Sequence, residues 1–468
     1  MEVSGDPSAE TGSEHERVAA ATVPPDNATL RRQLYALAMP VLVEYILTYC
    51  VGLFDVFLSG RISPEATQAV GLAAYVTWLI SMLVGLVSIG TNALVSRSWG
   101  ATDYATAHRV LNRSLALASG LSVVLALAVM AGASAFAHAV GVQGDGIAIA
   151  VRYLRFEAVG FLFVGVTLCG AAALRGSGDT RTPMKILGSV NVINMLASVA
   201  LVYGVGPIPS LGIDGIVLGT MFARLCGALL MLLALSRRRN GMRLDASEMR
   251  LWDETVRRIL RIGIPALGDS LSMWSGQLLF LMIIGRLGSS AALAAHMVGV
   301  RVEDVSYLPA LAFGAASGTM IGQRLGARDP ATARRIAHLG ARQGGLFALF
   351  GMVAFYFGAE QIYRTMHESP EVAAMGVPAF RWLALFQVPQ AMGLVYVYSL
   401  RGAGDTRSPM LITTMGVYGV RLPVAWLGGI VLQGGLLGAW VGMFADVSVR
   451  SILVCLRYSS GRWVRLEA

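Results

Sequence analysis

The sequence predicts an all-α polytopic membrane protein with about twelve transmembrane helices, in two six-helix lobes related by pseudo-twofold symmetry along the membrane normal. Its composition, its long apolar stretches and an internal repeat support this prediction. Of the 468 residues, 55% are hydrophobic and only 14% are charged, against roughly 25% charged residues in soluble domains. The chain therefore has too few polar residues to cover a soluble protein of this length.

Several apolar stretches are long enough to cross a bilayer, which takes about 20 residues of helix. Glycine is abundant, with 54 residues, as expected where membrane helices pack closely. We expect twelve helices, which begin near Leu37, Thr67, Arg113, Val151, Met184, Leu211, Ile259, Ala291, Arg335, Val377, Met410 and Leu436.

Basic residues lie in alternate loops between the predicted helices, and this distribution explains the net charge of +9 without a nucleic-acid partner. The densest group is the central loop, where residues 237–258 contain seven arginines, while the opposite loops hold scattered cases such as Arg61 and Arg286. By the positive-inside rule, both termini are cytoplasmic. We expect a multi-pass protein of the cytoplasmic (inner) membrane.

The chain repeats itself. The segment LRGSGDTRTPM at residues 174–184 recurs as LRGAGDTRSPM at residues 400–410, with nine of eleven positions identical. Pro40 and Pro265 keep nearly the same offset of 226 residues. Because six helices is an even number, both copies have the same orientation in the membrane. Two-lobed transporters of this kind hold substrate between the halves and rock to expose it to each side in turn.

The repeat and the charge pattern divide the chain into five parts. Residues 1–30 are a polar segment that we expect to be a disordered cytoplasmic tail, since it has no basic stretch followed by an apolar core. Residues 31–236 form the N-terminal lobe, 237–257 a basic cytoplasmic linker, 258–456 the C-terminal lobe and 457–468 a cytoplasmic C-terminal tail.

The repeated motif has a structural interpretation. Its glycines permit a tight turn after a helix, and Thr182 and Ser408, each followed by proline, are typical of an N-cap with proline at the first helical position. Glycine-rich loops can also hold phosphate, but the chain contains no Walker lysine pattern. We therefore expect no bound cofactor and no direct use of ATP.

These motifs resemble the multidrug and toxic compound extrusion (MATE) family, and more closely its DinF-like prokaryotic branch. The resemblance covers nearly all of the chain after residue 30. It is carried by Pro40 through the segment DVFLSG at 55–60, by both repeated motifs, and by segments 294–303 and 322–326. It implies export of small organic, often cationic, compounds in exchange for protons or sodium ions, by a protein that functions as a monomer in the lipid bilayer.

Ionisable residues in the first lobe are candidates for cation coupling, because such residues are costly at membrane depth. Asp55 and Glu44 lie eleven residues apart on one helical face, about 16 Å from each other. The resemblance assigns the family's coupling aspartate to Asp55 and further polar ligands to Asn194 and Thr220. Ser198 stands where cation-binding members carry a second aspartate. The alternatives are that Asp55 pairs near a helix end and that Asn194 bonds to a neighbouring helix.

The serine at position 198 bears on which ion is coupled to transport. Sodium is a hard cation that prefers oxygen ligands, and the only metal site we expect is a sodium site at Asp55 and Asn194. Because Ser198 removes one carboxylate, the sequence favours protons over sodium.

The second lobe carries a different set of ionisable residues. Asp269 is at the position equivalent to Glu44, whereas Phe280 replaces the equivalent of Asp55. His296 and Glu303 are seven residues apart and share a helical face. They are candidates for a second proton site or for binding a cationic substrate, and the alternative is that His296 is a satisfied core residue.

Further polar residues are candidates to line a substrate site between the lobes, with ordinary packing as the alternative. The membrane arginines Arg301, Arg381 and Arg421 need acidic partners, for which Glu303 or Asp446 is available. The candidate liners are Gln277, Gln387 and Tyr396, with Gln390, Met392 and Trp382.

Two other functions are alternatives to export. A flippase for lipid-linked substrates is the main alternative to an exporter, but it more often has a strongly basic central cavity. A membrane-embedded enzyme needs a catalytic cluster such as HExxH or GxSxG, and the chain contains neither. We therefore expect a transporter that is not an enzyme.

Overall fold

The computed structural model describes residues 25–140, 146–207, 209–237 and 242–465. Within these ranges the chain is helical and has no β-strand. Eleven helices are long and apolar enough to cross a membrane, and the pair α5 and α6, which meet at 41°, makes a twelfth span. The predicted all-α fold with twelve spans is confirmed.

The N-terminal lobe contains the first seven helices. They are α2 (Asn27–Gly60), α3 (Pro64–Gly100), α4 (Tyr104–Ala139), α5 (Gly146–Phe161), α6 (Val164–Gly176), α7 (Arg181–Tyr203) and α8 (Ile213–Ser236). The linker contains the short 3-10 helix η2 (Ala246–Glu248).

The C-terminal lobe repeats this plan. Its first four helices are α9 (Glu254–Gly285), α10 (Ser290–Gly326), α11 (Pro330–Met366) and α12 (Pro370–Gly402). The fifth span is built from four short segments, α13 (Arg407–Gly416), η3 (Val417–Arg421), α14 (Leu422–Trp426) and η4 (Leu427–Val431). The last helix is α15 (Gly435–Ser459), and the short helix η5 (Arg462–Arg465) follows it. The segments η3 and η4 are π-helical.

The predicted boundaries differ from the structure at both chain ends and also inside the chain, where α4 begins at Tyr104 rather than near Arg113. The first helix begins at Asn27 rather than near Leu37, because the Asp26 carboxylate caps it by accepting a hydrogen bond from the Thr29 N–H at 2.9 Å. The part of the predicted N-terminal tail that lies before residue 25 is outside the described residues. At the other end, α15 continues to Ser459 and is followed by η5 instead of an immediate tail.

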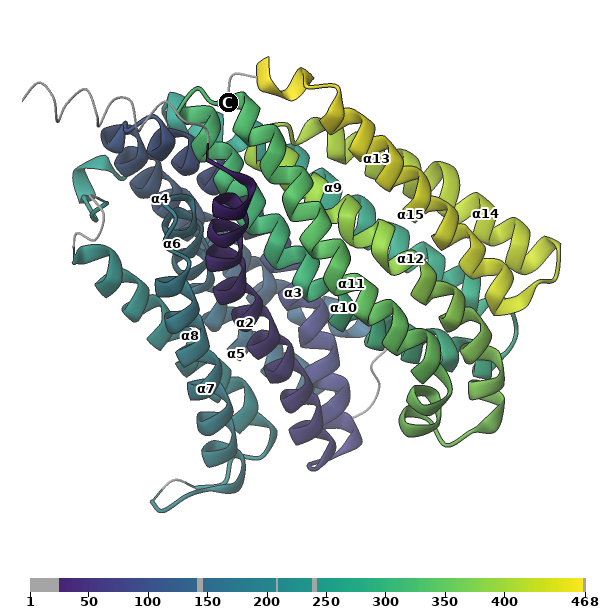
Figure 1. Ribbon diagram of the computed structural model, residues 1–468. Coiled ribbons are helices and arrows are strands. Elements are labelled where there is room, and N and C mark those ends of the chain that lie inside the picture. The colour runs from purple at the N-terminus through teal and green to yellow at the C-terminus, as the bar shows by residue number, and fades with distance from the viewer. Residues whose placement is uncertain (1–24, 141–145, 208, 238–241, 466–468) are drawn as a thin grey trace, which may run out of the picture.

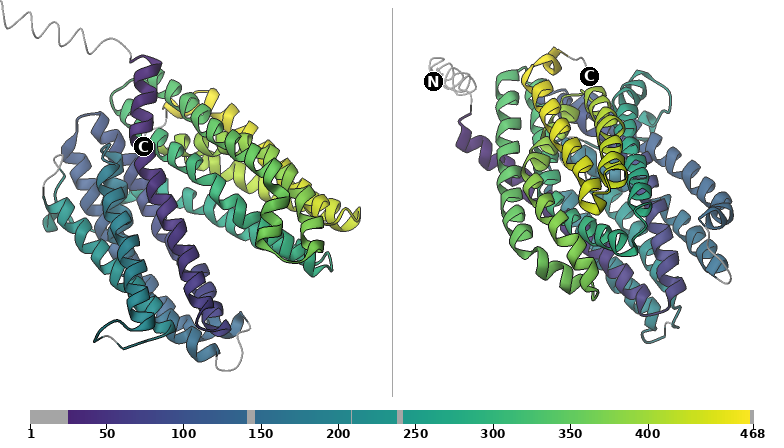
Figure 2. Two further views of the ribbon diagram at one scale, coloured as in Figure 1. Left: turned by 60° about the horizontal axis from the view of Figure 1, so that its bottom comes forward. Right: turned by 90° about the vertical axis from the view of Figure 1, so that its right-hand side faces the viewer.

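The two lobes meet at one end and diverge at the other. Figure 1 and Figure 2 show the purple-to-teal helices of the first lobe and the green-to-yellow helices of the second lobe converging near the C-terminus and separating away from it. At the converging end, α3 contacts α10 so closely that a Cβ on Gly100 would lie 1.8 Å from the Gln323 carbonyl oxygen, and one on Gly326 would lie 1.9 Å from the Arg97 carbonyl oxygen. Only glycine fits at these two positions.

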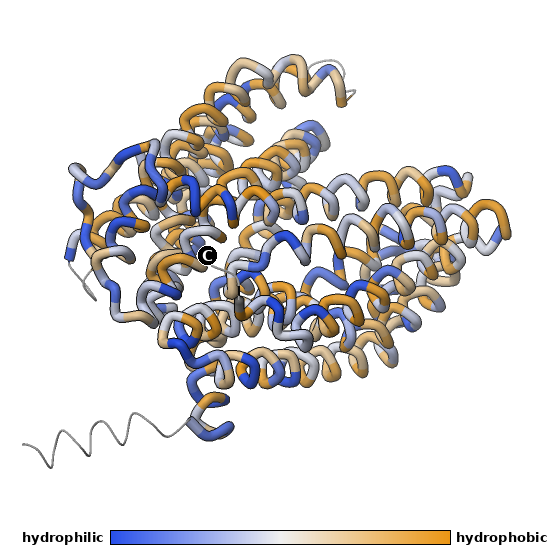
Figure 3. The backbone as a smooth tube through the Cα atoms, turned by 90° about the horizontal axis from the view of Figure 1, so that it is seen from above, coloured by the Kyte–Doolittle hydropathy of each residue, from blue (hydrophilic) through white to orange (hydrophobic). Residues whose placement is uncertain are grey.

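The surface of the helices suits a bilayer. Hydrophobic segments run along most of the helices, and hydrophilic segments gather around the helix ends near the C-terminus (Figure 3). Large apolar side chains such as Phe357, Leu196 and Leu127 are exposed to 78%, 67% and 62%. Apolar surface on this scale is stable where lipid rather than water covers it.

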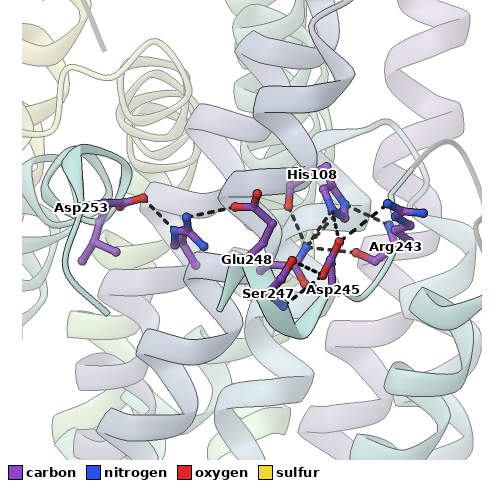
Figure 4. Close-up of polar contacts among 9 residues, drawn as sticks. His108, Arg243, Asp245, Ser247, Glu248 and Asp253 are labelled. Carbon is purple, nitrogen blue, oxygen red and sulfur yellow. Dashed lines mark hydrogen bonds and ion pairs between the residues drawn. The ribbon is translucent and has the colours of Figure 1, made fainter. Parts of the chain in front are cut away.

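The linker is fastened to the first lobe. The buried guanidinium of Arg113 on α4 pairs with Glu248 at 3.0 Å and with Asp253 at 2.7 Å, and Asp253 is also the N-cap of α9 (Figure 4). Beside it, the Asn112 amide donates to the Arg243 carbonyl oxygen at 3.1 Å. Hydrogen bonds from the Ser247 side chain and backbone hold the pKa of the neighbouring Asp245 below its usual value. Through its ion pairs with Glu248 and Asp253, Arg113 connects the first lobe to the first helix of the second lobe.

The repeated motif forms the same turn in both lobes. Gly178 and Gly404 adopt φ angles of 92° and 90°, which favour glycine, so the predicted tight turns are confirmed. The expected N-caps are wrong in detail. The Asp179 carboxylate, not Thr182, caps α7, since it accepts hydrogen bonds from the Thr182 N–H at 2.9 Å and from its hydroxyl at 2.7 Å. Asp405 does the same for α13.

Candidate functional site

The arginine of each repeated motif holds the acid on the first helix of its own lobe. Arg175 donates to Glu44 at 3.2 Å, and Arg401 pairs with Asp269 and also lies over the ring of Tyr398. Both acids are buried. The motif arginine thus makes the same kind of contact in both lobes. Glu44 and Asp269, which the sequence suggested for coupling and for substrate, each already have a cationic partner.

The polar residues of α7 and α8 meet at the interface of these two helices. The Asn194 amide donates to the Thr220 hydroxyl at 2.9 Å, so the predicted pair is brought together. Ser198, one turn further along α7, donates weakly to the Ile216 carbonyl oxygen at 3.4 Å. Ser198 packs so closely on α8 that a Cβ on Gly219 would lie 2.6 Å from its hydroxyl. An aspartate at position 198 would force the two helices apart.

Asp55 belongs to a third helix, α2. It is near the end of α2, and its Oδ1 atom is buried without a hydrogen-bond partner. Its carboxyl is within electrostatic range of two charged side chains, Glu157 and Arg224. A buried charged oxygen without a donor is unfavourable. Asp55 is therefore a candidate to bind a cation that neutralises this carboxylate.

Sequence analysis missed Glu157 and Arg224. Glu157 on α5 is only 4% exposed, and its Oε1 accepts hydrogen bonds from Arg224 on α8 at 2.7 Å and from Thr77 on α3 at 2.8 Å. Arg224 also packs on the ring of Phe161 at 5.4 Å. Their position in the membrane could have revealed them. Both lie eleven residues after the first residue of their helix, about 16 Å along it, and charged residues at that depth in a membrane are candidates for function.

The membrane charges of the first lobe do not balance. Glu44 is matched by Arg175 and Glu157 by Arg224, which leaves the carboxyl of Asp55 as the one without a cationic partner of its own among these described residues. The Asn194–Thr220 pair lies next to this group, since Thr220 and Arg224 are four residues apart on the same face of α8.

In the second lobe, Glu303 is the centre of a buried hydrogen-bond network. It accepts from the Tyr307 hydroxyl and from the Gln387 amide, the latter at 3.5 Å. The Gln390 amide donates to Tyr307, and the Ser306 hydroxyl donates to Gln387. The structure thus brings together three predicted residues, Glu303, Gln387 and Gln390, and adds Tyr307.

A second buried group contains two arginines. Arg421 pairs with Asp446 at 2.7 Å, as the sequence suggested, and Arg450 pairs with the other oxygen of Asp446 at 2.7 Å. The side-chain amide oxygen of Gln277 accepts a hydrogen bond from Arg421 at 3.3 Å. Arg421 ends the π-helical segment η3, a feature that is frequent at functional sites. Its charge also acts on Glu303.

Four of the remaining candidates lie outside these groups. His296 is buried between Phe280 and Trp440, and it accepts a hydrogen bond from the Trp440 indole at 3.2 Å. Tyr396 packs against Tyr458, and its hydroxyl lies 2.8 Å from the His338 ring nitrogen. Both therefore have packing partners of their own. Arg301 and Arg381 are exposed rather than paired inward.

The two lobes therefore differ in charge. In the second lobe, Glu303 and Asp446 face Arg421 and Arg450, so two negative charges meet two positive charges. In the first lobe, Asp55 and Glu157 face the single charge of Arg224. Among the side chains of these two groups, the first-lobe group has one acid more than it has arginines, and the second-lobe group has equal numbers of both.

Comparison with known protein sequences finds relatives along nearly the whole chain. The sequence model of the family MatE matches residues 40–200 and again residues 265–427, so one model recognises both lobes. A probable multidrug resistance protein NorM of Thermotoga maritima is 28% identical over 439 residues, which is 93% of each chain. The multidrug resistance protein PmpM of Pseudomonas aeruginosa is 25% identical over 449 residues, covering 93% of this chain and 92% of its own length.

Solved structures share the fold. A crystal structure of MATE in the bent conformation has a TM-score of 0.86 at 20% identity and covers 94% of this chain and 99% of that chain. An outward-facing conformation of a multidrug resistance MATE family transporter has a TM-score of 0.84 at 20% identity, covering 92% and 97%. These likenesses confirm the two-lobed architecture.

Proposed function

The chain belongs to the multidrug and toxic compound extrusion (MATE) family, and from this premise we propose that it is a secondary active exporter of small organic compounds. It works by alternating access, in antiport with a cation, and it acts in the cytoplasmic membrane. The names of its relatives, which are multidrug resistance proteins, support this substrate class.

One observation carries the proposal, namely the carboxyl of Asp55. Its Oδ1 atom is buried without a partner, in a lobe whose membrane charges leave one negative charge over. A coupling site must be able to exist both with and without its cation. A carboxylate that is already paired with arginine cannot alternate in this way, because separating a buried ion pair costs free energy. Asp55 is the described first-lobe residue that meets this requirement. Of the two ions, we propose the proton, because Ser198 supplies no second carboxylate.

The orientation follows from the arginines of the alternate loops, which support a cytoplasmic position for both termini. The converging end of the lobes, where Gly100 and Gly326 lie, is then cytoplasmic. The diverging end faces outward. The likeness to an outward-facing transporter of the same family supports this assignment.

The test is efflux from liposomes that contain the purified protein and a fluorescent organic cation. A proton gradient and a sodium gradient are imposed separately. We expect efflux to follow the proton gradient and to be unchanged when sodium replaces choline. Efflux that needs sodium would contradict proton coupling, and the absence of efflux under both gradients would contradict the proposed function.

Substrate binding is expected to depend on the second lobe. Glu303→Gln removes the negative charge of the Glu303 network, and a carboxylate attracts an organic cation more strongly where water is excluded. We expect Kd for cationic compounds to rise roughly ten-fold, equivalent to about 1.4 kcal/mol, with a smaller change for neutral compounds. Binding is measured by titration in detergent, with the exposed Glu360→Gln as the control. Equal losses for both classes of compound would indicate a structural role for Glu303.

A further inference from the structure

We propose that Arg224 sets the ion specificity of the first-lobe site: its guanidinium is a built-in cation that neutralises Glu157 and leaves Asp55 as the single group for a coupling proton. This inference rests on the proposed function, since it assumes that Asp55 is the coupling residue. It concerns Glu157 and Arg224, which belong to α5 and α8 and come close to Asp55 of α2.

The ion pair is a built feature of the lobe. Its two side chains meet at 2.7 Å, and Thr77 donates a second hydrogen bond to the same Glu157 oxygen at 2.8 Å. Gly160, one turn after Glu157, leaves the room that Arg224 needs, because a Cβ there would lie 2.9 Å from the Arg224 Nη1 atom. A larger residue at position 160 would push the guanidinium away.

Two unpaired atoms show that the group is not complete by itself. The Arg224 Nη1 atom and the Asp55 Oδ1 atom are both buried, and neither has a hydrogen-bond partner. The groups that act on Asp55 are the carboxylate of Glu157 and the guanidinium of Arg224, and the hydroxyl of Tyr153 shares the same surroundings. The group carries one net negative charge when Asp55 is ionised and none when Asp55 is protonated.

Sodium and a proton differ in what they need from this group. A sodium ion needs several oxygen ligands, and with Glu157 held by Arg224 the Asp55 carboxylate is the one acid of this group left to bind it. A proton on Asp55 forms a covalent O–H bond and needs no further ligands. In the second lobe, the position equivalent to Arg224 is Arg450, at the offset of 226 residues, where it neutralises Asp446. Both lobes thus use this position of their last helix for a fixed cation.

The test is the effect of sodium on thermal unfolding of the purified protein in detergent. Arg224→Gln leaves Asp55 and Glu157 as two carboxylates without a fixed cation, and two neighbouring carboxylates attract a cation strongly. At about pH 9, chosen because a neighbouring carboxylate raises a carboxyl pKa, we expect sodium chloride to raise the Tm of Arg224→Gln by roughly 3 °C relative to choline chloride. The unmodified protein and Arg224→Lys, which keeps the charge, are expected to show no difference between the salts.

The matched control is Arg152→Gln. Arg152 pairs with Asp214 at 3.0 Å between the same two helices, but its side chain is 55% exposed, so sodium is expected to have no effect. A folded Arg224→Gln variant that ignores sodium would overturn the inference, and so would a sodium-dependent Tm of the unmodified protein or of Arg224→Lys. The unfolding measurement does not depend on transport, whereas failure of liposome efflux would overturn the proposed function alone.

Discussion

Asp55→Asn is expected to abolish gradient-driven efflux and to leave the protein folded. Asparagine is nearly identical to aspartate in shape but cannot take up or release a proton. The Asp55 Oδ1 atom accepts no hydrogen bond, so the substitution breaks no internal contact there and replaces a buried charge with a neutral amide. We therefore expect an unchanged or slightly raised Tm in detergent. Efflux from liposomes should fall to the level of liposomes without protein, for cationic and neutral compounds alike.

The control for this experiment is Asp214→Asn, which removes a partly buried acid of the first lobe that pairs with the exposed Arg152. It is expected to transport normally. Binding of substrate to Asp55→Asn is measured separately by titration, because a coupling mutant can still bind its substrate. Full efflux by Asp55→Asn under a proton gradient would exclude Asp55 as the coupling residue.

The spans and the repeat could be predicted from the sequence because each depends on residues that are close together in the chain. A membrane helix is a run of apolar residues, and twelve such runs with arginines in alternate loops already imply the topology. The motifs at residues 174–184 and 400–410 reveal the duplication directly. Helix ends were less accurate, since a cap such as Asp26 extends a helix beyond its apolar part.

The partners of the ionisable residues could be predicted only in part. For the membrane arginines the sequence offered two acids, Glu303 and Asp446, and the structure pairs Arg421 with Asp446. Glu157 and Arg224 are 67 residues apart on helices whose faces the sequence does not orient. Their contact depends on how α5 and α8 cross, which no local pattern encodes.

The role of the motif arginines also could not be predicted from the sequence without knowledge of the fold. In sequence, Arg175 and Arg401 belong to a turn, and Glu44 and Asp269 to the first helix of each lobe. In the structure, each arginine binds the acid of its own lobe. The acids thus hold the motif turn against the first helix, while Asp55, which has no counterpart at Phe280, makes the first lobe different.

Replacing Gly326 by leucine is expected to stop transport by preventing the converging end of the lobes from closing. In the observed state, a Cβ at this position would lie 1.9 Å from the Arg97 carbonyl oxygen. Since this neighbour is backbone, α3 and α10 would have to separate. The lobes would then favour a state that is open at this end, and alternating access would stop because one of its two states is no longer reachable. We expect efflux at the background level and substrate binding that is retained.

Thiol labelling can distinguish this result from misfolding. Asn92→Cys, in a chain without the four native cysteines, introduces a thiol on α3 at the contact with Thr319 of α10. We expect a membrane-impermeant reagent to label it from the cytoplasmic side faster in the Gly326→Leu variant than in the unmodified background. Gly85→Leu is the matched control on α3, because a Cβ on Gly85 would meet nothing within 4 Å; it should be labelled slowly and should transport. Normal efflux by Gly326→Leu would mean that this contact does not need to close during transport.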